Sequence, residues 1–320
     1  MTPSVRSSAA PTWDIGQITD NGERVTHLHA DDCYYAHLSI YAFAAARVKD
    51  KQVLDAGSGT GYGSAYLADH GARFVTGLDI SSTAVAFSQA SFQRPNLKYQ
   101  VMDLEAISGF PERQLDVIFS SNSLEHLPHV LAFMRTAWQL LKPAGELIVA
   151  VPPITNADLR AANEANPYHL NIWTPQQWAE VLGQYFAEVS SYRHISKGPE
   201  QVLRFEGGEH FDVTENDFAV EALSLAQLAV QPTLTAIFVA RQLRPAAEVP
   251  AARASVTFVD DSYTRSSARS EPEPPPVSWW KWPGRAWEIF RHKGAQKLVH
   301  RTGTILHAWT SAALGSKQHQ

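Results

Sequence analysis

Cysteine is almost absent from this chain, since Cys33 is the single one among 320 residues. One thiol cannot form an intramolecular disulfide, which excludes a disulfide-stabilised scaffold and makes a reducing, cytoplasmic compartment the simplest setting. No apolar run approaches the roughly 20 residues that a transmembrane helix requires, and residues 1–11 have no apolar segment typical of a secretory signal. We therefore expect a cytoplasmic protein with no membrane-spanning helix and with a disordered start over residues 1–12.

A surplus of basic residues is also absent, because 27 basic side chains stand against 32 acidic ones, for a net charge of −5. This balance gives no general attraction to nucleic acid, and we expect no nucleic-acid partner. Residues 243–277 are rich in proline, alanine, serine and charge, which predicts a disordered linker. The sequence thus predicts a folded domain over residues 13–242, the linker, and a tail over residues 278–320. It does not indicate an oligomeric state.

The tail differs from the rest of the chain in charge and in aromatic content. It holds five of the nine tryptophans and seven basic side chains against one acidic side chain. On a helix drawn from Pro283, Trp287, Phe290 and Trp309 fall on one stripe. A basic amphipathic helix with tryptophans is typical of a membrane-surface element or of a helix that fits a partner's groove. Peripheral contact with the inner membrane face is one expectation, and packing against the chain's own domain is the alternative.

Residues 51–63 carry the clearest local pattern. An apolar run indicates a buried strand, then Gly57, Gly59 and Gly61 follow directly, ahead of a helix-like stretch. Residues without a Cβ atom let a ligand approach the backbone closely. The pattern therefore predicts a ligand-binding turn between a strand and a helix.

The class of ligand is narrowed because the turn does not match the dinucleotide-binding motif. The dinucleotide fingerprint needs glycine at its first, third and sixth positions. The frame from Gly57 has Tyr62 at the sixth position, and the frame from Gly59 has Ser64 there. Asp55, two residues before the first glycine, would repel a pyrophosphate and favour a cationic ligand. A nicotinamide dehydrogenase is thereby disfavoured.

Strand-like and helix-like patterns alternate along the chain, which predicts an α/β fold with a doubly wound, mostly parallel sheet of seven strands. The strands are expected around residues 53–54 and at 73–79, 97–101, 115–119, 146–151, 187–192 and 233–241. The helices are expected at residues 30–48, 64–70, 83–92, 130–141 and 218–230, with another beginning after Thr174. Asp79 and Asp103 end the second and third strands. Such strand ends lie at the crevice where ligands bind in open α/β sheets, and Asp79 has close to the spacing of a ribose-binding acid.

This ordered set of motifs resembles the class I S-adenosylmethionine (SAM)-dependent methyltransferases. The matching stretches are residues 53–61, 77–80, 102–104, 116–119 and 141–147. The resemblance implies a Rossmann-like methyltransferase fold that ends in an antiparallel hairpin, with SAM as cofactor. It also implies that Asp103 accepts a hydrogen bond from the adenine amino group. The cofactor-binding residues expected on this basis are Asp55, Gly57, Ser58, Gly59, Gly61, Asp79, Ile80, Met102, Asp103, Leu104 and Ser120.

The chemistry is expected in residues 120–129, after the fourth strand. His126 and Glu125 are candidate bases there, and His126 is favoured because a neutral imidazole, with a pKa of about 6.5, accepts a proton near neutrality. His169 is the second candidate base, because members of the family carry a similar histidine-containing loop. Each histidine has a structural alternative, as a capping, packing or surface residue. No metal ligands are assigned.

The resemblance implies methyl transfer to an oxygen or nitrogen of a small-molecule or glycan acceptor, such as a lipid-linked precursor of a bacterial surface polysaccharide. A quinone-like acceptor or another small metabolite is an alternative. So is a non-catalytic scaffold protein that binds SAM. Residues 198–232 are expected at the mouth of the cleft, where they shape the choice of substrate or cover the sheet edge.

Overall fold

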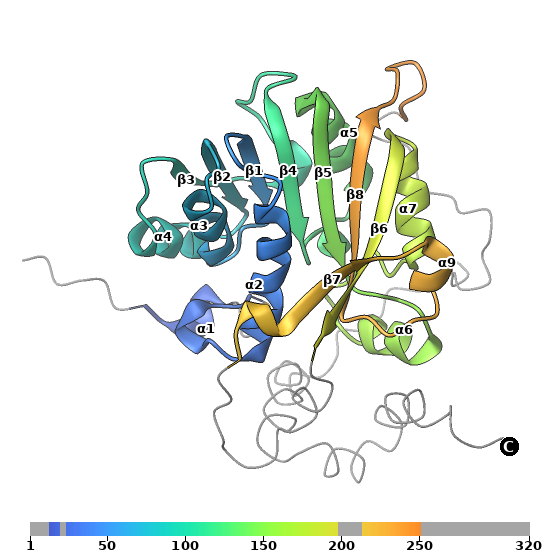
Figure 1. Ribbon diagram of the computed structural model, residues 1–320. Helices are drawn as coiled ribbons and strands as arrows, with labels where there is room; N and C mark the ends of the chain where they lie inside the picture. Colours follow the sequence, from blue (N-terminus) through green and yellow to red (C-terminus); the bar gives the residue numbers. More distant parts are fainter. Residues whose placement is uncertain (1–12, 20–23, 198–212, 251–320) are drawn as a thin grey trace, which may run out of the picture.

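The computed structural model describes residues 13–19, 24–197 and 213–250, which form one eight-stranded sheet with helices on both faces (Figure 1). The strands are β1 (Gln52–Ala56), β2 (Phe74–Asp79), β3 (Leu97–Val101), β4 (Leu115–Ser121), β5 (Leu141–Val151), β6 (Phe186–Ser196), β7 (Phe218–Ala222) and β8 (Thr235–Leu243). Their order across the sheet is β3-β2-β1-β4-β5-β8-β6-β7. The first five strands run parallel, whereas β8 is antiparallel to both of its neighbours. The predicted doubly wound α/β architecture is confirmed.

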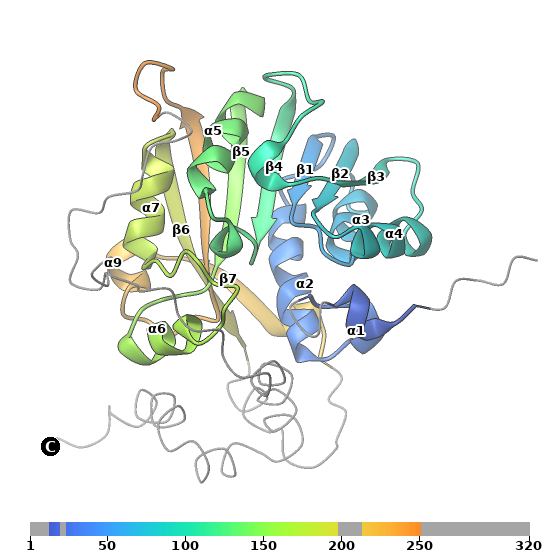
Figure 2. The ribbon, with the colours of Figure 1, turned by 180° about the vertical axis from the view of Figure 1, so that it is seen from behind.

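Different helices cover the two faces of the sheet. α2 (Asp32–Ala45) and α3 (Tyr62–Asp69) lie on the face turned to the viewer in Figure 1. α5 (Val130–Leu140) and α7 (Pro175–Gly183) cover the opposite face, which Figure 2 brings forward. Successive strand residues point to opposite faces, so neighbours such as Val53 and Leu54 enter two separate apolar cores. Both faces of the central strands are therefore buried, as the continuous apolar runs in the sequence require.

The predicted count of seven strands is wrong, because β7 adds an eighth at the edge. Residues 218–230 were expected to be a helix, but residues 218–222 pair antiparallel with β6, and the helix is confined to α9 (Leu225–Leu228). Phe218 is buried and its ring lies 5.5 Å from that of His194. Pairing with β6 satisfies the backbone hydrogen bonds of this segment. This pairing outweighs the segment's weak helical preference, and a sequence window cannot show which of the two prevails.

Local signals set the first residues of two helices, and the predicted start of a helix after Thr174 is confirmed. Thr174 caps α7, Pro175 occupies the first turn, and Gln177 completes the capping box. Ser81 accepts a hydrogen bond from the Ala84 N–H and so caps α4 (Ser82–Ser91). Such signals work because each bond joins residues that are close in sequence.

The packed part of the chain continues past residue 242, where the domain was predicted to end. Val249 is buried in the core, and Trp138 Nε1 donates to the Arg244 carbonyl at 3.0 Å. The first residues of the predicted linker thus lie against the domain. Most of that linker, the N-terminal 12 residues and the tail at 278–320 lie outside the described residues. Within the described part of the chain, no helix combines the length and the hydropathy that crossing a bilayer would need.

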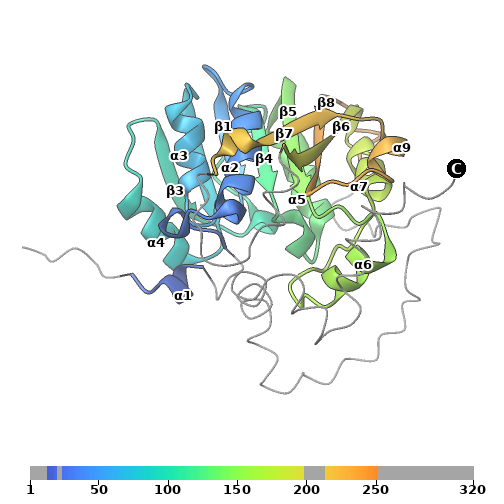
Figure 3. The same cartoon turned by 60° about the horizontal axis from the view of Figure 1, so that its bottom comes forward.

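The parallel strands all end at one edge of the sheet, the lower edge in Figure 1, where α1 (Ile15–Ile18) and α6 (Ala157–Glu164) lie. Figure 3 turns this edge toward the viewer. In open α/β sheets the carboxyl ends of the strands form the crevice that binds ligands. The predicted site residues in the loops after β1, β2, β3 and β4 therefore converge on this edge.

Candidate active site

The glycine turn after β1 has the backbone that its sequence predicts. Gly57, Gly59 and Gly61 have φ angles of 87°, 53° and 86°, in the left-handed region that residues with a Cβ atom rarely adopt. A Cβ atom added to Gly57 would lie 2.0 Å from Ser123 Oγ. Gly57 is thus required both by its φ angle and by the close approach of the loop that follows β4. The turn lies directly beside the segment predicted to carry the chemistry.

Asp55 lies beneath this turn, in the protein interior. It is fully buried, and its carboxylate accepts hydrogen bonds from Ser64 Oγ at 2.5 Å and from the Tyr41 hydroxyl at 3.3 Å. Burial raises the pKa of Asp55 to about 7, although the hydrogen bonds from Ser64 and Tyr41 act in the opposite direction. Asp55 is therefore held by protein groups, and with a pKa of about 7 it carries only a partial charge near neutral pH.

Asp79, at the end of β2, is the acidic side chain that organises the crevice. Its carboxylate accepts from the N–H groups of Gly59 and Ser81 at 2.9 and 2.8 Å, and Arg24 approaches to 3.3 Å. Ile80, the next residue, is a large apolar side chain that is 66% exposed. A carboxylate beside an exposed aliphatic side chain at a strand end suits a nucleoside. The ribose hydroxyls can donate hydrogen bonds to the carboxylate, and the base can pack against the aliphatic side chain.

The other predicted cofactor residues occupy three kinds of position. Asp103 is exposed at the end of β3, and Met102 beside it is half-buried. Leu104 is buried in the core, which leaves it little surface to offer a ligand. Ser58 is buried in the loop after β1, and Ser120 is buried near the end of β4. Asp103 and Met102 therefore keep the exposure that a role in adenine binding requires.

His126 lies in a short 3-10 helix (Leu124–His126) that begins three residues after β4 ends. Its Nδ1 atom is 3.0 Å from the Tyr168 carbonyl oxygen, and its Nε2 atom is 4.0 Å from Glu125 Oε1. Glu125 is 1% exposed, whereas the His126 side chain is 31% exposed. The Nε2 atom of this partly exposed ring thus lies beside a buried carboxylate.

His169 meets His126 although the two are far apart in the sequence. The two ring centroids are 5.0 Å apart in an edge-to-face arrangement. His169 Nδ1 is 2.6 Å from Asn163 Oδ1. Burial lowers the pKa of His169 to about 4, and the neighbouring His126 acts in the same direction. Both predicted candidate bases are therefore present at one place, with His169 neutral at physiological pH.

Sequence reasoning missed several residues that hold this site together. Ser123 packs against Gly57, Arg24 reaches Asp79, and Asn163 orients His169. None of these contacts leaves a signal in the sequence, because each joins segments that only the fold brings together. Tyr41 was recognisable as an aromatic residue on a helix ahead of β1, but its bond to Asp55 was not.

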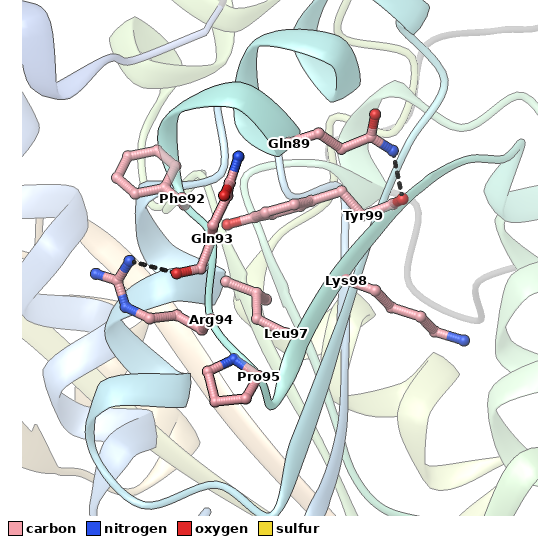
Figure 4. A pocket seen from close by; sticks show the side chains of 8 residues that line it. All are labelled: Gln89, Phe92, Gln93, Arg94, Pro95, Leu97, Lys98 and Tyr99. Carbon is pink, nitrogen blue, oxygen red and sulfur yellow. Dashed lines mark hydrogen bonds between the residues drawn. The ribbon is translucent and has the colours of Figure 1, made fainter.

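A separate surface pocket lies beside β3, at the end of α4 (Figure 4). It is lined by Gln89, Phe92, Gln93, Arg94, Pro95, Leu97, Lys98 and Tyr99. No predicted cofactor or catalytic residue is among them. We therefore place the candidate active site at the strand ends described above and not in this pocket.

Comparison with known proteins identifies the kind of domain that carries these residues. Residues 54–149, which contain the glycine turn, Asp79, Asp103 and His126, match a protein family described as "Methyltransferase domain". A "Probable S-adenosylmethionine-dependent methyltransferase" of Mycolicibacterium smegmatis is 29% identical over 163 residues, which cover 50% of this chain and 62% of that protein. A "Ubiquinone biosynthesis O-methyltransferase" of Coxiella burnetii is 39% identical over 102 residues, which cover 31% of this chain and 43% of that protein.

Among solved structures, a SAM-dependent methyltransferase of Thermotoga maritima is similar in fold, with a TM-score of 0.50 at 12% identity. The match covers 65% of this chain and 90% of that one. The chain spans less than two thirds of the length of the two curated relatives above. The matched family and the ordered strand-end residues agree on one conclusion: residues 54–149 are a methyltransferase domain of the class I SAM-dependent family, whose cofactor is S-adenosylmethionine.

Proposed function

We propose that this protein transfers the methyl group of SAM to an oxygen or nitrogen atom of a small-molecule or glycan acceptor. The observation that carries the proposal is the contact between Gly57 and Ser123. It joins a glycine turn suited to the cofactor with the segment that presents His126. A donor site and a pair of candidate bases thereby share one edge of the sheet.

The residues at the strand ends are suited to SAM. The left-handed glycines leave the backbone open, Asp79 offers carboxylate oxygens to a ribose, and exposed Ile80 offers apolar surface to a base. The Asp79 carboxylate gives the turn a negative potential, to which Asp55 adds fully only above pH 7, and this potential favours a cationic ligand and disfavours a pyrophosphate. Arg24 already pairs with Asp79, so a ribose must share or replace that contact.

Bound SAM supplies a methyl group on a positively charged sulfur, which is already a good leaving group. The protein's task is then to align the acceptor and to exclude water. A hydroxyl acceptor must also lose its proton, and Nε2 of His126 or His169 is the atom available to accept it. An amine that arrives uncharged would not need this step.

Two acceptor classes have support. Tyr168 and Leu170, beside the two histidines, are 38% and 53% exposed, so an acceptor with an apolar part would find surface to contact. The similarity to a ubiquinone biosynthesis O-methyltransferase favours a quinone-like molecule. A glycan acceptor, including a lipid-linked one, is favoured by the resemblance of the sequence to glycan-pathway enzymes.

The test is incubation with SAM labelled in its methyl group and a panel of phenolic, quinol and glycan acceptors, followed by mass spectrometry of the products. Calorimetry with S-adenosylhomocysteine runs beside it. Asp79→Asn should weaken that binding by about tenfold or more, because it removes charge-assisted hydrogen bonds. Binding without transfer to any acceptor would favour the scaffold alternative. A clean titration by a dinucleotide, with none by S-adenosylhomocysteine, would overturn the proposal.

For the tail at residues 278–320, we propose peripheral contact with an anionic membrane surface. Its seven basic side chains and five tryptophans support this, since each basic group near such a surface adds about 1 kcal/mol. Co-sedimentation of the full chain, and of a chain ending at Pro250, with anionic vesicles tests the proposal. Equal binding by the two proteins would contradict it.

A further inference from the structure

Three side chains with metal-binding chemistry meet at the mouth of the crevice. Glu125 and His126 come from the loop after β4, and His169 comes from the loop after α6. One potential ligand atom from each side chain lies within 4.8 Å of the other two. We propose that Glu125, His126 and His169 bind one divalent transition-metal ion, with Zn²⁺ as the ion to test.

The hydrogen bonds around the two rings decide which nitrogen of each can bind a metal. The Tyr168 carbonyl oxygen can only accept, so His126 Nδ1 carries the proton in this bond. Asn163 Nδ2 donates to the Leu159 carbonyl, which turns Asn163 Oδ1 toward His169 and makes His169 Nδ1 a donor too. When such a ring is neutral, its lone pair is therefore on Nε2. Metal-binding histidines show this same arrangement, in which the second nitrogen donates to a carbonyl or carboxylate oxygen.

The two loops are also joined through their backbones, which holds the three side chains in place. The N–H groups of Leu170 and Asn171 donate to the Glu125 carbonyl at 2.8 and 2.9 Å. The Asn171 side chain donates to the carbonyls of Leu124 and Leu127 at 2.9 and 2.8 Å. The loop that carries His169 is thus fastened to the loop that carries the other two ligands. A site built this way loses little conformational entropy when an ion binds.

The ligand set favours a borderline metal. Two imidazole nitrogens and one carboxylate oxygen form catalytic zinc sites that keep a position open for a further ligand, and the same set suits iron(II). Two ligands on a tetrahedral zinc ion are about 3.4 Å apart, so ligand atoms that lie within 4.8 Å of one another must close by up to about 1.4 Å. Rotation of the partly exposed His126 ring can supply that movement.

The metal-binding proposal does not depend on methyl transfer. It uses the same two Nε2 lone pairs as the base role, so a bound ion and a histidine base exclude one another. If the proposed function also holds, a metal here would lower the pKa of an acceptor hydroxyl bound to it. The ion would then promote loss of the hydroxyl proton, which is the role otherwise assigned to the histidine base.

The test is titration of the chelator-treated full chain with Co²⁺, whose visible absorption reports the ligands, followed by displacement with Zn²⁺. We expect one Co²⁺ per chain. Glu125→Gln, His126→Ala and His169→Ala should each weaken binding by at least about 100-fold. Asn163→Ala should weaken it by about 10- to 100-fold, while Asn163→Asp, which keeps an acceptor for His169, should retain it.

His70→Ala is the matched control, because His70 is exposed and stacks on Tyr66 outside the cluster. It should bind Co²⁺ as the wild type does, and circular dichroism checks that each variant is folded. No binding at millimolar Co²⁺, or equal binding by His169→Ala, would overturn the proposal. Calorimetry with S-adenosylhomocysteine reports on the cofactor site separately, so failure of the metal site and failure of the proposed function are distinguishable.

Discussion

Among single residues, Asp55 shows how burial changes the chemistry of a group. Its pKa is about 7 in the folded protein and is near 3.8 for an ordinary aspartate, with burial as the main cause. At a pH between these two values, Asp55 stays protonated in the folded protein but is ionised in the unfolded chain. The stability contributed by this group is therefore full below about pH 4 and is lost as the pH rises toward and through 7.

Asp55→Asn removes this titration. The free energy of unfolding of the variant, relative to that of the wild type, should rise by on the order of 4 kcal/mol between pH 4 and pH 8. Urea denaturation of both proteins at several pH values measures this difference. A difference that stays constant across that range would mean that Asp55 titrates normally.

At the scale of elements, the crossing of α2 and α3 depends on one small residue. Tyr41 on α2 reaches Asp55 because Gly63 on α3 leaves room for its ring. A Cβ atom on Gly63 would lie 2.0 Å from that ring. A fourth glycine, Gly63, therefore supports the glycine turn. Its role is to allow close helix packing and not to adopt a left-handed backbone.

Gly63→Ala should lower the free energy of unfolding by about 1–3 kcal/mol, because the two helices must separate. Gly183→Ala is the control, since an added Cβ atom there meets nothing within 4 Å, and it should not destabilise the protein. Adding Gly63→Ala to a Tyr41→Ala background should cost much less, because the obstructing ring is gone. Chemical denaturation measures all of these changes. An equal cost with and without the ring would contradict this account.

His194 on β6 connects three elements, because it contacts Ser39 of α2 at 2.8 Å and Thr235 of β8 at 3.4 Å. Burial, together with His37, lowers the pKa of His194 from 6.5 to about 3. The unfolded chain takes up a proton near pH 6.5, so the stability contributed by the neutral ring is full above that pH and is lost as the pH falls toward 3.

His194→Gln should make the protein less sensitive to acid. Between pH 4 and 6, the pH dependence of its unfolding free energy should differ from that of the wild type by up to about 1.4 kcal/mol per pH unit. Denaturant titrations across this range give the slope for each protein. Identical slopes would show that His194 is not the group that takes up the proton.

At the scale of the whole molecule, the packed part of the described chain extends beyond the predicted boundary at residue 242. Val249 completes the core beside α5, and Arg244 Nε donates to the Gly183 carbonyl at 2.6 Å. These contacts lie in residues whose composition resembles a linker, so composition alone placed the boundary too early.

A chain ending at Pro250 should unfold at about the same denaturant concentration as the full chain. A chain ending at Gln242 should lose about 2 kcal/mol or more, because it lacks the buried Val249 and the bonds of Arg244. Denaturation of the three proteins decides between the two boundaries. Equal stability of both truncated chains would place the end of the domain at 242.

The sequence by itself determined the glycine turn, the succession of the parallel strands along the chain and the start of α7, and it predicted His126 and His169 as candidate bases. These features depend on residue type or on bonds between residues close in sequence. Tertiary structure alone decided that residues 218–222 form an edge strand, that Tyr41 and Ser64 enclose Asp55, and that His169 joins Glu125 and His126. The physical reason is that each of these arrangements depends on contacts between segments distant in sequence, and such contacts arise when the apolar faces of the sheet are buried.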